Sequence, residues 1–429
     1  MVERSRSGER AVLVHLDVKE LAAGGEGQDL REFQDLVNST GAEIAAVVTG
    51  ARKAPDPQYF VGSGKAEEVC DQVAATGAPL AIFDHALSPS QERNLEKLIQ
   101  CRVLDRTGLI LDIFARRARS FEGKLQVELA QLNHMSTRLV RGWSHLERQR
   151  GGIGLRGPGE TQLETDRRLI GNRIKQIHKR LDKVRKRRGQ NRRARKKAAV
   201  PTISLVGYTN AGKSTLFNKL TQADVYTADQ LFATLDPTLR RLDLGHVGHA
   251  VLVDTVGFIR QLPHDLIEAF HATLQETREA DLLLHVIDTG DEQHELHVEQ
   301  VNRVLTEIGV ERVPQIMVYN KIDLLDLPPR IAHDPQRCIT RAWLSAATGA
   351  GVEVLRAMLI RIMQSETVYG WLDLPADAGR ARSRLFAMGA VLQEKVDDYG
   401  ASHLQVQMPR HQFESFSQHE GLSALELRN

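Results

Sequence analysis

The stretch 202-TISLVGYTNAGKST-215 decides the fold of this chain. Its apolar, β-branched first half predicts a buried strand, and the residues after its glycine-rich turn predict a helix. The turn has the spacing GxxxxGKS, in which Gly207 and Gly212 let backbone amides converge on phosphate groups. Lys213 is placed to reach the outer phosphates, and the hydroxyl of Ser214 suits Mg²⁺. The stretch therefore predicts a nucleotide-binding domain of the α/β class.

A second segment, 250-AVLVDTVG-257, predicts a strand that ends in two phosphate-sensing groups. Asp254 is placed to hold Mg²⁺ through a water molecule, and the backbone amide of Gly257 can contact the terminal phosphate. Phe258 follows at the place where Ras-like switches carry a glutamine that positions the attacking water. We therefore expect slow intrinsic hydrolysis that needs a group supplied from elsewhere. The alternative is that Phe258 packs away from the nucleotide.

Two further segments indicate the base specificity. The segment 315-QIMVYNKID-323 predicts a strand that ends in the pattern NKxD, and 344-LSAAT-348 follows another predicted strand and supplies backbone amides. The carboxylate of Asp323 can accept hydrogen bonds from N1 and N2 of guanine, which adenine does not offer. Four elements in this order predict a GTPase, which converts GTP to GDP and phosphate.

The segment between Asp224 and Arg240 is expected to be the first switch. Its threonines Thr227, Thr234 and Thr238 are the candidates for the hydroxyl that completes the Mg²⁺ shell when GTP is bound. Residue types alone leave all three candidates open.

Residues 1–115 alternate between strand and helix patterns, which predicts a small, mostly parallel α/β domain. The segment 62-GSGK-65 lacks the spacing of a phosphate loop, so we expect a turn that opens a helix. The expected strands are 11–18, 43–50 and 79–84, and the expected helices are 28–41, 64–77 and 89–100.

Residues 116–198 predict an antiparallel helical hairpin whose tip is mobile, because 149-QRGGIGLRGPGETQLE-164 is rich in glycine and separates two helical patterns. The apolar stripes have coiled-coil spacing. They comprise Leu125, Leu129, Leu132, Met135 and Leu139 on the first helix, and Ile170, Ile174, Ile177, Leu181 and Val184 on the second.

Charge is distributed unevenly along the chain. Between Arg173 and Lys197 there are 14 Lys or Arg residues and one acid, Asp182, a local charge of +13 that leaves −11 for the rest of a chain whose net charge is +2. Such a run is usually a solvated helix face, but this density favours the neutralisation of phosphates, and so structured RNA. The expected RNA contacts are Arg148, Arg150, Arg156, Lys183, Arg185, Lys186, Arg187, Arg188, Arg192 and Arg193.

Composition and length set outer limits. The 429 residues are 41% hydrophobic and 26% charged, as in ordinary globular proteins, and the length predicts about three domains. We recognise neither an export signal nor a membrane-spanning run, and three scattered cysteines indicate no zinc site, so a cytoplasmic protein is expected. Residues 199–369 should form the GTPase domain, a P-loop domain with a mostly parallel sheet. Residues 370–429, with a helix near 379–395 and a strand at 403–408, should form a small α+β domain.

Six motifs together make the chain resemble the HflX family of ribosome-associated GTPases, in the Obg-HflX group of translation-factor-related P-loop GTPases. The likeness covers almost the full length and is specific outside the generic GTPase motifs. The motifs are 59-YFVGSGKAEE-68, 151-GGIGLRGPGETQLE-164, 207-GYTNAGKS-214, 231-LFATLD-236, 254-DTVGF-258 and 320-NKID-323.

The resemblance implies a function that spacing and charge do not. A family member would bind the large (50S) ribosomal subunit and its RNA, with the N-terminal region toward the peptidyl transferase centre. It would split or rescue stalled ribosomes under stress such as heat, with hydrolysis stimulated by the whole ribosome. We expect a ribosome-associated, cytoplasmic monomer. The alternatives are a large-subunit assembly factor that uses GTP as a timer and a nucleotide-driven RNA-remodelling protein.

The resemblance also selects site residues. It favours Thr234 as the switch threonine, with Ser214 and, through water, Asp254 as the other Mg²⁺ ligands. Asn210 resembles an asparagine that binds K⁺ in relatives, although it could instead only stabilise the loop. No certain catalytic residue is assigned; Lys213, Thr234 and Gly257 stabilise the transferred phosphoryl group. The expected GTP-binding residues are Gly207, Tyr208, Thr209, Asn210, Ala211, Gly212, Lys213, Ser214, Thr215, Phe232, Ala233, Thr234, Leu235, Asp236, Asp254, Thr255, Val256, Gly257, Asn320, Lys321, Ile322, Asp323, Ser345 and Ala346.

Overall fold

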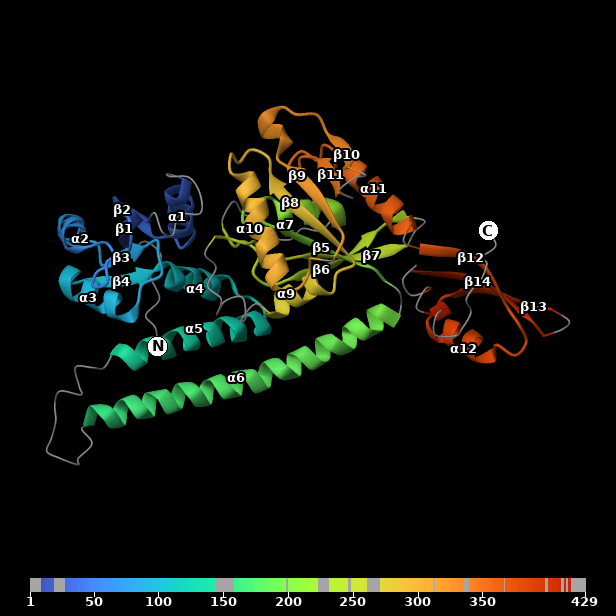
Figure 1. Cartoon of the computed structure of the whole chain (residues 1–429), viewed down its shortest axis with the longest axis horizontal. Coiled ribbons are helices and arrows are strands. Elements are labelled where there is room, and N and C mark those ends of the chain that lie inside the picture. The colour runs from blue at the N-terminus through green and yellow to red at the C-terminus, as the bar shows by residue number, and fades with distance from the viewer. Residues whose placement is uncertain are drawn as a thin grey trace. The chain divides into compact units, whose positions relative to one another are not determined.

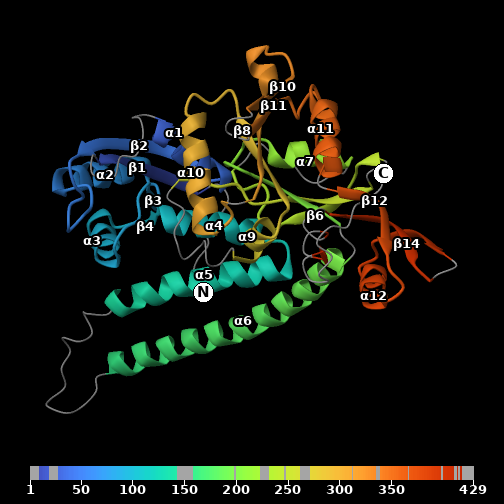
Figure 2. The same cartoon turned by 45° about the vertical axis from the view of Figure 1, so that its right-hand side comes forward.

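The computed structural model divides the chain into two compact units. The first contains Met1–Val184, Tyr226–Asp236 and Val256–Leu274, and the second contains Arg185–Val225, Pro237–Thr255 and Gln275–Asn429. Figure 1 and Figure 2 show their elements coloured along the chain. The structure describes residues 9–18, 28–142, 158–197, 200–222, 231–245, 248–260, 271–311, 313–334, 339–365, 367–397, 400–409, 413 and 416–417. Within these ranges, every helix is too short or too polar to span a bilayer.

The first unit is built on a four-stranded parallel sheet of order β2-β1-β3-β4. Its predicted strands and helices are confirmed, whereas β4 and α4 were not predicted. The strands are β1 (Arg10–Val18), β2 (Glu43–Arg52), β3 (Leu80–Phe83) and β4 (Arg102–Asp105), and the helices are α1 (Gln28–Ser39), α2 (Ser63–Thr76), α3 (Pro89–Ile99) and α4 (Arg106–Arg117).

Local signals explain where these helices begin. A capping box starts α3, because Gln91 N donates to the Ser88 hydroxyl and Ser88 N donates to the Gln91 side chain. The carboxylate of Asp105 caps α4 by accepting from Gly108 N at 2.8 Å. Helix α2 begins directly after Gly62, so 62-GSGK-65 does open a helix, as predicted. These caps fix the ends of the elements that meet at the sheet's carboxyl edge.

The hairpin consists of α5 (Phe121–Gly142) and α6 (Pro158–Lys197). The predicted seam is confirmed over its first half, where Leu125, Leu129, Ile177 and Leu181 form a buried cluster. Leu132 and Ile174 pack against that cluster. The predicted loop 149–164 is too long, because residues 158–164 are already helical. Proline at the first position of α6 explains this start, since its missing N–H has no helical partner there.

The second unit contains a seven-stranded sheet of order β10-β11-β9-β8-β5-β7-β6, in which only β6 and β10 pair antiparallel. This confirms the predicted mostly parallel sheet. The strands are β5 (Thr202–Gly207), β6 (Thr238–Asp243), β7 (His249–Asp254), β8 (Leu282–Asp288), β9 (Gln315–Asn320), β10 (Arg330–Asp334) and β11 (Ile339–Trp343). The helices joining or flanking them are α7 (Lys213–Thr221), α9 (His271–Arg278), which spans the boundary between the units, α10 (His294–Glu307), the 3-10 helix η2 (Ile322–Leu325) and α11 (Val352–Ser365).

The C-terminal part is a small α+β structure, as predicted. Its antiparallel sheet has the order β12-β14-β13, formed by Thr367–Leu374, Ser402–Pro409 and Val391–Val396. The predicted helix near 379–395 is wrong beyond its first half, because α12 covers only Gly379–Ala387. The chain then turns at Gly389, whose φ of +66° favours glycine, and continues as a strand.

Candidate nucleotide-binding site

The phosphate loop joins a wholly buried strand, β5, to helix α7, which begins at Lys213. Two of its glycines cannot be replaced without displacing backbone or a buried side chain. A Cβ on Gly207 would lie 2.2 Å from the carbonyl oxygen of Val286, and one on Gly212 would lie 2.2 Å from Nδ2 of Asn320. Both glycines also have positive φ, 146° and 90°. The loop therefore needs glycine for close packing as well as for phosphate access.

Lys213 lies beneath this loop, with 6% of its surface exposed. Its ammonium donates to the carbonyl oxygens of Gly207 at 3.2 Å and Tyr208 at 2.6 Å. Burial lowers the pKa of Lys213 to about 8, although the charge of Asp254 opposes this. Burial and the nearby lysine also lower the pKa of His285 to about 4, so this histidine is neutral at pH 7. The loop thus holds a desolvated cation whose charge is opposed by the buried carboxylate of Asp254.

The lowered lysine pKa predicts that nucleotide affinity falls as pH rises. Phosphate oxygens favour the charged form, so the pKa of Lys213 rises on binding and a proton is taken up. With a free-protein pKa of about 8, we expect GDP affinity to weaken about threefold between pH 7.5 and pH 8.5. Calorimetry in buffers of different ionisation enthalpy measures both the affinity and the proton uptake. Constant affinity and no proton uptake over this range would show that the pKa of Lys213 is not lowered in the free protein.

The oxygen groups expected at Mg²⁺ lie together, with Ser214 in the first turn of α7 and Asp254 at the end of β7. The hydroxyl of Ser214 donates to Oδ2 of Asp254 at 2.7 Å, and Asp254 is fully buried at the end of β7. The hydroxyl of Thr255 donates to the carbonyl of Leu205 at 2.5 Å and holds the two strand ends together. A hydroxyl and a carboxylate are hard oxygen ligands, so this pair fits Mg²⁺ chemically.

Asn320 ties the predicted base loops to the phosphate loop. Its Nδ2 donates to the carbonyl of Ala211 at 2.8 Å, and its Oδ1 accepts from the amide of Ala346 at 2.8 Å. Lys321, whose φ is +64°, pairs with Asp288 at 2.7 Å. Asp323 lies in the first turn of η2 and is exposed, so its carboxylate is open to a ligand. The structure therefore brings together segments more than 100 residues apart, as the motifs predict.

Sequence reasoning missed the aromatic contacts that support these loops. Tyr319 and Trp343 stack with centroids 5.0 Å apart, and the Arg330 guanidinium lies 4.1 Å from the Trp343 ring centre. These aromatics stand just before the NKxD and 344-LSAAT-348 loops. Tyr208 stacks on His297 at 3.8 Å. The available signal was an aromatic residue at the end of each strand that precedes a loop.

The predicted switch residues 232–236 and Val256–Phe258 belong to the first unit. Phe232 is buried and meets Phe114 edge-on at 4.6 Å. The carboxylate of Asp236, expected at the nucleotide, instead accepts from Ser120 N at 2.7 Å and from Arg119 N at 2.9 Å. Thr234 is half-buried. Phe258 is 3% exposed, so its ring is packed inside the protein.

The expected RNA contacts are placed only in part. Lys183, Arg185, Lys186 and Arg187 are exposed along α6, and Arg188 is half-buried. Arg192 and Arg193 are in the same helix, but their side chains are outside the described residues. The tip arginines Arg148, Arg150 and Arg156 lie outside the described residues altogether.

The second unit thus has a phosphate loop on a buried strand, a serine–aspartate pair beside it and an NKxD segment bonded to it. On a mostly parallel seven-stranded sheet, this arrangement defines a P-loop GTPase.

Comparison with known proteins identifies the family. Models described as "GTP-binding GTPase N-terminal", "GTP-binding GTPase Middle Region" and "50S ribosome-binding GTPase" match residues 27–115, 117–195 and 202–321. The chain is 60% identical to GTPase HflX of Escherichia coli K12, covering 95% of this chain and 96% of that protein. It is 45% identical to GTPase HflX of Magnetococcus marinus, covering 92% and 91%. The chain belongs to the HflX family, and it is a GTPase.

A solved structure of a GTP-binding protein, SsGBP with GDP, covers 83% of this chain and 99% of its own. Its sequence identity is 24% and its TM-score is 0.47, so the family assignment rests on the sequence relatives alone.

Proposed function

We propose that this GTPase binds the large ribosomal subunit and uses GTP to split or rescue stalled ribosomes in the cytoplasm, under stress such as heat. The observation that carries the proposal is the match of residues 202–321 to a "50S ribosome-binding GTPase" in a chain that also has an exposed basic helix. The family relatives support it over 95% of the chain.

In this proposal the nucleotide is held by the residues that the motifs predict. Lys213 binds the outer phosphates; among the residues that the structure describes, the acceptors of its ammonium are the backbone carbonyls of Gly207 and Tyr208. Ser214 and Asp254 hold Mg²⁺, joined by Thr234 from the first switch when GTP is bound. Asp323 reads guanine, with Asn320 and Ala346 fixing the loops around it. Bound Mg²⁺ would neutralise charge on the phosphates.

Hydrolysis is expected to be slow in the free protein. Phe258 has no group that could orient or deprotonate water, and its ring is buried. The missing group or conformation is therefore supplied on the ribosome, which makes hydrolysis a response to binding. A GTP-bound state with ordered switches would bind the large subunit, and hydrolysis would release it.

The exposed basic side chains of α6 give the large-subunit contact a testable electrostatic signature. Each phosphate contact contributes about −0.9 to the slope of log affinity against log salt for a duplex. Replacing four such residues with serine is expected to weaken large-subunit binding and make this slope shallower by about 3 to 4. Sedimentation binding in a GTP analogue at several salt concentrations measures it. The four residues are Lys183, Arg185, Lys186 and Arg187.

A matched control uses basic residues that are equally exposed on other helices. Arg303→Ser on α10 and Arg361→Ser on α11 should leave both the affinity and the salt slope unchanged. Because the control removes two charges and the test set four, an equal effect per removed charge would show that only overall charge matters. Equal binding in GDP and in the GTP analogue by the natural protein would contradict the switch function. A strong preference for immature over mature subunits would favour an assembly factor instead.

Asn210 predicts that K⁺ accelerates turnover. It is exposed in the phosphate loop and has a φ of +59°. A K⁺ ion on its amide oxygen would place positive charge where an arginine finger acts, so we expect roughly tenfold faster turnover in K⁺ than in Na⁺ at equal ionic strength. Asn210→Gly removes the amide and accepts the same φ, so it should abolish the difference. Equal rates of the natural protein in both salts would rule K⁺ out.

A further inference from the structure

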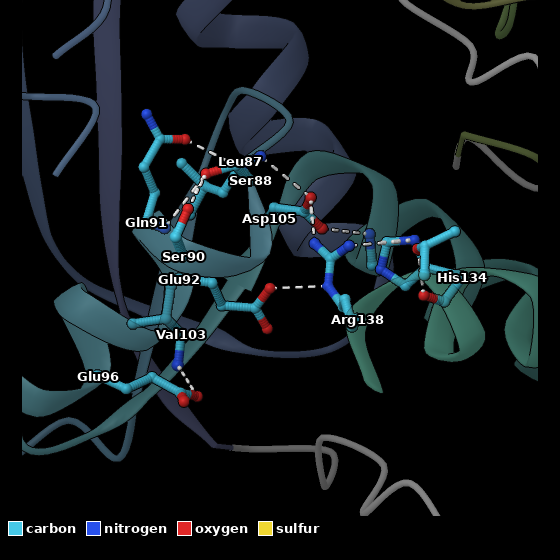
Figure 3. A network of polar contacts seen from close by, with 12 residues as sticks. Leu87, Ser88, Ser90, Gln91, Glu92, Glu96, Val103, Asp105, His134 and Arg138 are labelled. Carbon is cyan, nitrogen blue, oxygen red and sulfur yellow. Dashed lines mark hydrogen bonds and ion pairs between the residues drawn. The ribbon is translucent and has the colours of Figure 1, made fainter. Parts of the chain in front are cut away.

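Arg138 ties the tip end of α5 to the N-terminal sheet. It lies one turn before the end of α5 at Gly142, and Figure 3 shows its side chain pointing toward α3 and β4. Its Nε donates to Oε2 of Glu92 at 2.7 Å, and its Nη2 donates to Oδ2 of Asp105 at 2.8 Å. Among the described side chains, the hairpin seam runs from Leu125 to Leu129 with Leu132 packed against it, so the contact of Arg138 holds a later turn of α5.

The carboxylate of Asp105 is a fixed point. Its side chain is 3% exposed, and besides Arg138 it accepts from Gly108 N at 2.8 Å and Leu87 N at 3.2 Å. It therefore caps α4 and anchors α5 at once (Figure 3). By contrast, the pair of Arg173 with Glu128 joins the two hairpin helices on the surface, where ion pairs contribute little.

The next residue, Arg106, faces the switch segment. Its guanidinium is 5% exposed and donates to Oδ1 of Asp84 at 2.5 Å and to Glu32. It also donates to the backbone carbonyl of Arg260 at 3.4 Å, and the Arg260 side chain lies 3.8 Å from Glu32. Arg260 stands two residues after Phe258, within the segment that follows the phosphate-sensing glycine. All these residues belong to the first unit.

Asp105 and Arg106 are consecutive at the start of α4. Asp105 contacts Arg138 on α5, and Arg106 contacts Arg260 in the switch segment. We propose that they form a charged relay through which the nucleotide state of the switch segment sets the position of the C-terminal end of α5, with Arg138 and Arg260 as its two terminal positioning residues. The proposal rests on the proposed function only in that the hairpin serves the large subunit.

Buried ion pairs change between discrete arrangements, because a packed protein interior does not deform continuously. A switch segment rearranges when the terminal phosphate is present. If Arg260 moves away, Glu32 loses its ion pair with Arg260 and keeps the one with Arg106, whose guanidinium is buried. A shift of Arg106 at the first turn of α4 moves the adjacent cap, Asp105, and with it Arg138. Because coupling is reciprocal, a partner that holds the end of α5 would bias the switch segment in turn.

Amide hydrogen exchange tests the relay in the free protein. We expect the exchange of residues 133–142 to differ between GDP and a GTP analogue in the natural protein, and the difference to disappear in Arg260→Met. Arg173→Met should keep the difference, because its pair with Glu128 lies outside the relay. If the exchange of 133–142 is the same in both nucleotides, or if Arg260→Met leaves the difference intact, the relay does not exist.

A double-mutant cycle on large-subunit binding tests the same connection at its other end. The quantity is the ratio of the dissociation constant in GDP to that in the GTP analogue. Arg138→Met and Arg260→Met should each reduce this ratio at least fivefold, and the double variant no further than either alone. Additive effects, or an Arg138→Met ratio equal to that of Arg173→Met, would overturn the relay.

Two controls separate the possible failures. Arg138→Lys keeps the charge and should retain most of the ratio even if Arg138→Met unfolds, which thermal unfolding reports. If the natural protein does not bind large subunits at all, the proposed function fails, and the exchange measurement still decides the relay.

Discussion

An Asp323→Asn variant is expected to prefer xanthine to guanine nucleotides. Asp323 is exposed at the start of η2, in a loop that Asn320 bonds to Ala211 and Ala346. A carboxylate accepts two hydrogen bonds from guanine, whereas an amide presents one donor and suits the 2-oxo group of xanthine. A matched bidentate pair contributes 1–3 kcal/mol of discrimination, so GTP affinity should fall about 10- to 100-fold while XTP affinity rises. Fluorescent-nucleotide titration measures both.

Asp326→Asn supplies the matched control. Asp326 lies three residues further along the same loop, is also exposed, and is outside the NKxD pattern. Its φ of +51° is tolerated by asparagine, so this variant should keep the natural preference for GTP. If Asp323→Asn retained GTP specificity, or if both variants lost it equally, Asp323 would not be the base-reading residue.

A Lys213→Met variant is expected to lose GTP turnover by roughly 100- to 1,000-fold, the usual effect of deleting one charge-stabilising donor at a transferred group. Its melting temperature should change little, because two effects oppose one another. Methionine removes the cost of burying a charged ammonium, but it also removes a positive charge beside buried Asp254. Single-turnover hydrolysis and thermal unfolding measure the two quantities.

The control is Lys219→Met, an exposed lysine on the same helix, α7. It should keep both turnover and melting temperature. A Lys213→Met variant that hydrolysed GTP at the natural rate would show that Lys213 does not contact the transferred phosphoryl group. A variant that merely failed to fold would show that the lysine is structural.

Local patterns predicted much of this fold because they report local physics. The glycines at positions 207 and 212 are required by close packing as well as by phosphate, so motif and structure agree there. The missed elements are either very short or carry buried polar residues that interrupt the apolar pattern. Strand β4 has only four residues, and α4 buries Arg106 and Asp112 among its apolar residues. Arg106 is satisfied by Asp84 and Glu32, which lie 22 and 74 residues away and so outside any local window.

In the candidate site, too, some contacts could be predicted from the sequence and others could not. Asp254 and Asn320 end strands that point to one edge of a parallel sheet, so their convergence follows from topology. Asp236 does not: its carboxylate bonds Ser120, 116 residues away, and nothing near either residue signals the contact. In the C-terminal part, the predicted helix was too long because the single Gly389 that ends it resembles a tolerated helix glycine.

In the proposed function, ribosomes both trigger this GTPase and are separated by it. GTP hydrolysis should be followed with the protein alone, with naked ribosomal RNA, with large subunits and with whole ribosomes, while light scattering reports subunit separation. We expect slow turnover alone, strong stimulation by the particles and a fall in scattering that requires GTP or its analogue. Stimulation by naked RNA alone, or no fall in scattering, would contradict it.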